Sequence, residues 1–77
     1  MEQVLKEMLS PSNQYKVQII KRKDGLFTTE LYRWQDDCGY EYWSPIKNGL
    51  SLFETEEGAL RLAIEHLRDY SGEIINP

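Results

Sequence analysis

Two short segments decide the fold of this chain: Glu30-Leu31-Tyr32-Arg33-Trp34 and, after a five-residue loop, Tyr40-Glu41-Tyr42-Trp43. They place five aromatic side chains within fourteen residues, largely at alternate positions. A period of two is typical of a half-buried β-strand, so the stretch predicts a hairpin with an aromatic face. Aromatic side chains on a small sheet either fill the core or form a contact surface.

The residues before this hairpin extend the predicted sheet. Residues 15–19 alternate apolar and polar side chains, and residues 26–34 are rich in β-branched and aromatic residues. Lys23-Asp24-Gly25 is the predicted turn between these two strands, because Gly tolerates the positive φ of a hairpin turn. The other predicted strands are residues 40–44, ended by Pro45, and residues 50–53 as a candidate fourth strand.

Helices are predicted at both ends of the sheet. Apolar side chains at positions 4, 5, 8 and 9 follow helical spacing, so residues 1–14 are expected to form a short helix and a linker. The main helix is predicted at residues 55–71, with Thr55 as N-cap and Gly72 as C-cap. Its predicted apolar face consists of Leu60, Ala63, Ile64, Leu67 and Tyr70.

We therefore expect one α+β domain over residues 1–77. Its three- to four-stranded antiparallel sheet, residues 15–53, should pack on the C-terminal helix, because an amphipathic helix must bury its apolar stripe. Residues 72–77 are predicted to be a loose tail.

The first turn decides which side chains share the sheet face under the helix. A two-residue turn places Val17 and Ile19 with the Tyr and Trp cluster, which then belongs to the core. A three-residue turn with a Gly bulge places them with Phe27, Leu31 and Trp43 instead. We favour the three-residue turn, because it gathers the aliphatic side chains under the helix.

In the favoured register, four aromatic side chains share the sheet face opposite the helix. Trp34 opposite Tyr40 implies Tyr32 opposite Tyr42, while Arg33 and Glu41 form a polar pair on the inner face. The four aromatic residues, Tyr32, Trp34, Tyr40 and Tyr42, are the candidate binding surface for an unknown protein partner or for a second copy of the chain. The competing interpretation is that the aromatic residues fill the core. In the favoured register, Ile20 shares the uncovered sheet face with these four aromatic residues.

Nucleic-acid binding is the alternative function. Residues 16–34 contain five basic and two acidic side chains, whereas residues 35–77 contain three and nine. Basic groups beside aromatic rings are typical of single-strand binding, although the net charge of −4 argues weakly against it. The basic residues of this candidate site are Lys21, Arg22, Lys23 and Arg33.

No catalytic or metal-binding motif is evident. His66 is the single His, and no nucleophile or second base follows at a useful spacing. Cys38 follows Asp36 and Asp37, an acidic setting that does not activate a thiol. These acids and Glu41 lack the alternate spacing of a calcium loop. We therefore expect no enzymatic activity, no cofactor and no bound metal.

The sequence favours a cytoplasmic location. A single Cys excludes an intramolecular disulfide, and a free thiol fits a reducing compartment. No apolar run approaches the roughly 18 residues of a membrane span, and residues 1–9 lack the features of a secretory signal. We therefore expect no membrane partner.

The order strand, Asp-Gly turn, two strands and a helix that opens with Thr-x-x-x-Ala resembles the small ββ(β)α half of HicB-like antitoxins. It is also similar to other uncharacterised prokaryotic and phage domains. The matching segments are Tyr15–Ile20, Asp24-Gly25 and Thr55–Leu60, within residues 15–70. This resemblance implies a prokaryotic protein-binding module that dimerises through its sheet.

Overall fold

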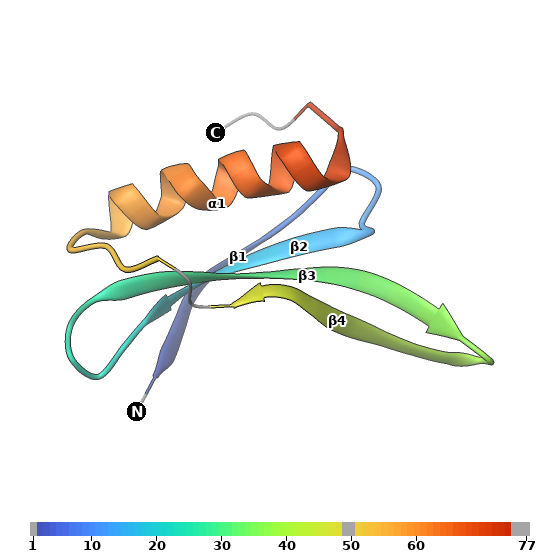
Figure 1. The fold of residues 1–77 in the computed structure, drawn as a ribbon, viewed down its shortest axis with the longest axis horizontal. Coiled ribbons are helices and arrows are strands. Elements are labelled where there is room, and N and C mark those ends of the chain that lie inside the picture. Colours follow the sequence, from blue (N-terminus) through green and yellow to red (C-terminus); the bar gives the residue numbers. More distant parts are fainter. Residues whose placement is uncertain (1, 49–50, 75–77) are drawn as a thin grey trace.

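The computed structural model describes residues 2–48 and 51–74. Its strands are β1 (Gln3–Leu9), β2 (Tyr15–Lys21), β3 (Phe27–Asp37) and β4 (Tyr40–Asn48), and they precede one helix, α1 (Glu56–Ser71). Each strand pairs antiparallel with the next along the chain, in the order β1-β2-β3-β4. α1 lies across one face of this sheet and packs on β2 and β3 (Figure 1). The predicted α+β class, an antiparallel sheet on one C-terminal helix, is therefore confirmed.

The N-terminal segment is an edge strand, so the helix predicted there is wrong. β1 pairs with β2 from Gln3 opposite Lys21 to Leu9 opposite Lys16, with a bulge between Val4 and Lys6. The extra residue at the bulge interrupts the period of two, so the apolar side chains imitate helical spacing. A helix this short is marginal alone, whereas the edge of β2 supplies hydrogen-bonding partners along the segment.

The turn between β2 and β3 has three residues, as the favoured register requires. The Arg22 backbone N–H donates to the Leu26 carbonyl at 2.8 Å, and the Gly25 N–H donates to the Arg22 carbonyl at 3.0 Å. Gly25 has a φ of 88°, which closes the turn as a Gly bulge. The resulting register places Val17 opposite Leu31 on the face that meets α1.

The β3–β4 hairpin is longer and tighter than predicted. It turns at Cys38 and Gly39, whose φ angles of 52° and 86° suit a two-residue type I′ turn. Pro45 does not end β4, because it lies beside a bulge on an edge strand where its missing N–H is tolerated. The hairpin extends past the C-terminal end of α1 (Figure 1).

The candidate fourth strand is reduced to one bridge among the described residues. Phe53 and Phe27 exchange two backbone hydrogen bonds of 2.8 Å beside the start of β3. Residue 50 of that predicted strand and residues 75–77 of the predicted tail lie outside the described residues.

α1 supplies the other half of the core. Thr55 caps it by accepting a hydrogen bond from the Gly58 N–H at 3.1 Å, and Gly72 ends it with a φ of 71°. No helix in the described part of the chain is both long and apolar enough to cross a membrane. The core that α1 completes consists of Val17, Ile19, Leu31, Ala59, Ala63, Ile64 and Leu67.

We expect the Leu67→Ala substitution to destabilise the domain by about 2–5 kcal/mol, because Leu67 is fully buried between α1 and the sheet. The free energy of unfolding from urea titration measures this loss. Leu52→Ala is the matched control, because the Leu52 side chain is 49% exposed and should cost little. Equal losses in the two variants would contradict the burial of Leu67 between α1 and the sheet.

Candidate interaction surface

The sheet face opposite α1 carries three aromatic side chains from two strands. Trp34 of β3 lies directly opposite Trp43 of β4, and Tyr32 precedes Trp34 on the same face. The two indole rings meet edge to face, with centroids 5.0 Å apart and planes at 66°. We refer to Tyr32, Trp34 and Trp43 as the aromatic face, and all three side chains are half-buried.

Lys16 of β2 lies against the aromatic face. Its Nζ atom is 4.6 Å from the Trp43 ring centroid and 5.3 Å from that of Tyr32. The Glu7 carboxylate of β1 is 3.7 Å from the same nitrogen, and only 14% of the Lys16 side chain is exposed. The ring faces and the carboxylate together offset the cost of removing this ammonium from water.

Hydrogen bonds join the polar groups on this side of the sheet. The Gln18 amide donates to the Glu7 carboxylate at 2.9 Å, and the Tyr32 hydroxyl donates to the Glu30 carboxylate. The pKa of Tyr32 is raised to about 12, mainly because the side chain is partly buried. The hydrogen bond to Glu30 and the negative charges of Glu30 and Glu7 raise it as well. Tyr32 is therefore held as a neutral hydrogen-bond donor.

Two of the four predicted binding residues lie on the opposite face. Because the hairpin turn has two residues rather than five, Tyr40 lies opposite Asp37 and Tyr42 lies opposite Gln35. Pairing Trp34 with Tyr40 and Tyr32 with Tyr42 was therefore wrong. Tyr40 and Tyr42 remain exposed, at 77% and 46%, on the α1 side of the hairpin.

The same shift in register corrects the predicted inner face. Trp43 faces away from α1, so it does not join Leu31 in the core. The predicted pair of Arg33 with Glu41 does not form, because Ser44 lies opposite Arg33 and Asp36 lies opposite Glu41.

The predicted basic residues do not converge on the aromatic face. Lys21 lies opposite Phe27, seven residues before Trp34 on β3, or about 23 Å at roughly 3.3 Å per residue. The Arg22 guanidinium forms an ion pair with Asp24 at 3.2 Å, and Lys23 is exposed in the same turn. Arg33 is exposed on the α1 side of β3.

Sequence reasoning missed three residues at this surface: Glu7, Lys16 and Trp43. The contact between Lys16 and Tyr32 was open to inference, because the three-residue turn places these two residues directly opposite each other. Finding Glu7 required recognition of β1 as a strand. Finding Trp43 required the two-residue turn at Cys38, where Asn would have been the clearer signal.

The remaining candidate groups lie on different elements of the structure. His66 is half-buried on α1, with its ring 6.3 Å from that of Tyr70 in an edge-to-face arrangement. Cys38 is exposed in the hairpin turn. Within residues 2–48 and 51–74, no group of three or more His, Cys, Asp or Glu side chains is placed to hold a metal ion.

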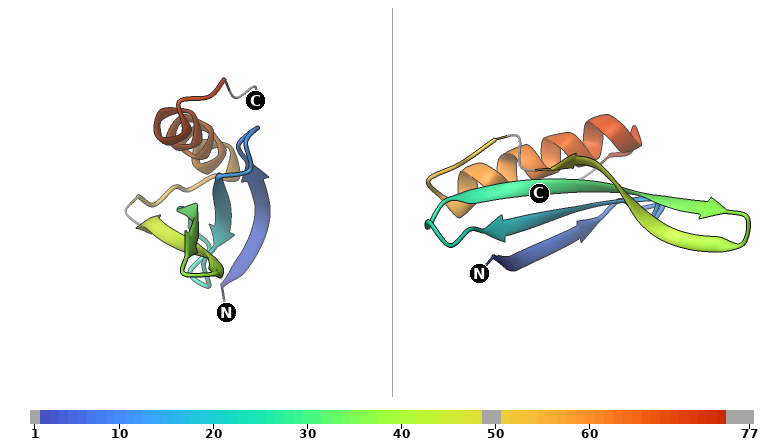
Figure 2. Two further views of the ribbon diagram at one scale, coloured as in Figure 1. Left: turned by 90° about the vertical axis from the view of Figure 1, so that its right-hand side faces the viewer. Right: turned by 60° about the horizontal axis from the view of Figure 1, so that its bottom comes forward.

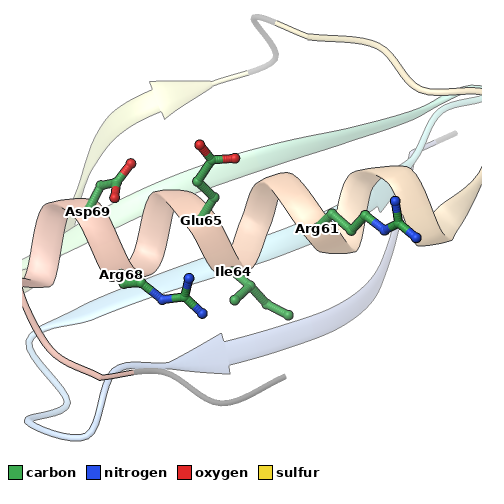
Figure 3. A pocket seen from close by; sticks show the side chains of 5 residues that line it. All are labelled: Arg61, Ile64, Glu65, Arg68 and Asp69. Atoms are coloured by element: carbon green, nitrogen blue, oxygen red, sulfur yellow. The ribbon is translucent and has the colours of Figure 1, made fainter.

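A hollow beside α1 likewise lacks a converging set of side chains. Figure 3 shows Ile64 and Arg68 directed toward β1, whereas Glu65 and Asp69 point to the other side of the helix. Arg61, which also lines the hollow, forms an ion pair with Glu57 at 3.4 Å. These side chains diverge around the helix, so the aromatic face is the stronger candidate.

Comparisons with protein families, with curated proteins and with solved structures found no match to this chain. The resemblance to HicB-like domains therefore stays a prediction.

We expect a tyrosine of this chain to ionise only near pH 12, and the Tyr32→Phe substitution to remove that step. The pKa of Tyr32 in the folded state lies above the ordinary value of 10, so the buried, neutral Tyr32 side chain stabilises the fold. This stabilisation is complete below pH 10 and is lost as the pH rises toward 12. Ultraviolet absorbance of tyrosinate measures the titration. Tyr40→Phe is the control on the opposite face, and a Tyr32→Phe curve that keeps the late step would contradict the assignment.

Proposed function

We propose that this chain is a protein-interaction module without enzymatic activity, and that the aromatic face is its contact surface. The carrying observation is that both tryptophans of the chain lie together on a sheet face that α1 does not cover. The buried core is instead built from Val, Ile, Leu and Ala side chains. Amphipathic aromatic residues that the core does not use are typical of interface hot spots.

The ordered contacts of this surface support the proposal. Trp43 is held between the Trp34 ring and the Lys16 ammonium, and Tyr32 is fixed by its hydrogen bond to Glu30. Side chains that are already ordered lose less conformational entropy when a partner binds. The surface is therefore suited to binding without rearrangement.

The partner is a second copy of the chain or another protein, and the solution mass distinguishes the two. The HicB-like resemblance favours the first, since it implies dimerisation through the sheet. Single-stranded nucleic acid has less support, because the predicted basic residues lie away from the aromatic face and Lys16 is already paired with Glu7. We further propose a cytoplasmic location, where the exposed Cys38 thiol stays reduced.

Replacing Trp34 by Ala should weaken association while the domain stays folded, because Trp34 lies outside the buried core. The lost edge-to-face contact costs about 1 kcal/mol beyond the loss of ring burial, so the variant should be less stable than the wild type but still folded, against a typical domain stability of about 5–15 kcal/mol. Light scattering after size-exclusion chromatography, over a tenfold range of concentration, measures the mass of the wild type and the variant. Tyr40→Ala is the matched control, because it removes an exposed aromatic ring from the other side of the same hairpin.

A wild-type dimer that Trp34→Ala dissociates and Tyr40→Ala preserves identifies a second copy as the partner. A wild type that is monomeric at every concentration identifies another protein, whose binding the two tryptophans then report by fluorescence. If Trp34→Ala abolishes cooperative unfolding, Trp34 is a structural residue and the proposal is wrong.

A further inference from the structure

We infer that the partner of the aromatic face presents arginine or lysine side chains from an exposed, positively charged protein segment. This inference rests on the proposed function and specifies the chemistry of the partner. Its first basis is the charge of the outer part of the β3–β4 hairpin, beyond Arg33 and before Lys47. Residues 34–46 contain Asp36, Asp37 and Glu41 and no Lys or Arg.

Two of these carboxylates continue the aromatic face toward the hairpin turn. Asp36 lies two residues beyond Trp34, and Glu41, directly opposite Asp36, lies two residues before Trp43. All four side chains therefore share one face, since alternate residues of a strand point the same way. Like charges directly opposite each other destabilise a sheet, and a cation placed between them would remove that cost.

None of the ion pairs found among the described side chains includes Asp36 or Glu41. Both carboxylates are exposed. Figure 2 shows the end of the β3–β4 hairpin extending beyond α1 and beyond β1 and β2.

Lys16 provides the second, independent basis, because it already places a cation against this face. Its ammonium lies 4.6 Å from the Trp43 ring centroid and is paired with Glu7. The tryptophan pair thus has a cation on one side and two uncompensated carboxylates on the other. A guanidinium suits the second position, since it can stack on an indole ring while donating to a carboxylate.

A hexa-arginine peptide is the probe, and the fluorescence of the two tryptophans reports its binding. The double variant Asp36→Asn with Glu41→Gln should bind about tenfold more weakly, because it loses two charge contacts. The control variant, Glu65→Gln with Asp69→Asn, removes the same charge from α1 and should bind like the wild type. Trp34→Ala should also weaken binding.

The inference is overturned if both double variants weaken binding equally, because net charge alone then explains the affinity. It is also overturned if saturating peptide leaves the fluorescence unchanged, or if oligo-dT of equal length binds more tightly than the peptide. The hairpin variant should unfold at the same or a higher urea concentration than the wild type, since it removes a repulsion. Lower affinity in that variant therefore does not reflect unfolding.

The mass measurement separates this inference from the proposed function. One outcome is a dimer that depends on Trp34, persists without the Asp36 and Glu41 carboxylates, and does not bind the peptide. That result would support the aromatic face as an interface and would overturn the inference of a positively charged partner. A second copy could itself supply the cations from its turn at Lys21–Lys23, which lies at the other end of the sheet. If the chain alone forms salt-sensitive, open-ended oligomers, the contact is head-to-tail between copies. That outcome would overturn the inference that a separate protein supplies the cations.

Discussion

The left-handed conformation of Gly25 determines which side chains of this sheet meet α1. With φ at 88°, Gly25 closes a three-residue turn that pairs Val17 with Leu31 and Lys16 with Tyr32. Those two pairs lie on opposite faces of the same strands. A turn shorter by one residue would exchange the faces of β3 relative to β2 and place Tyr32 under the helix. The aliphatic core and the aromatic face therefore have a common origin.

When a helix covers only one face of a sheet, the side chains on the other face must pack and pair with one another. Here the Lys16 side chain lies against Tyr32 and Trp43, and Glu7 accepts a hydrogen bond from Gln18 and forms an ion pair with Lys16 of the neighbouring strand. These contacts shield the centre of the sheet and leave ring surface available at its margin. The same residues therefore stabilise a small domain and present a surface to a partner, which matters because small domains have little stability to spare.

Local sequence signals correctly predicted the main helix and the first hairpin. Thr55 and Gly72 have the chemistry of caps, and Gly25 has that of a turn, so each could be recognised from its own residue type. The prediction of the second hairpin was wrong because Cys38 is an unusual residue for the first position of a two-residue turn. That error moved Tyr40, Tyr42 and Trp43 to the wrong faces, while Tyr32 and Trp34 were placed correctly. The bulge in β1 concealed its strand character in the same way.

The order of elements along the chain has a consequence for biosynthesis. α1 follows all four strands, so during translation the strands leave the ribosome before the helix that covers them. Until α1 emerges, Val17, Ile19 and Leu31 lack the apolar helix face that buries them in the folded domain. A nascent chain halted before Glu56 would present an uncovered apolar sheet with open edges, the kind of species that chaperones bind and proteases remove.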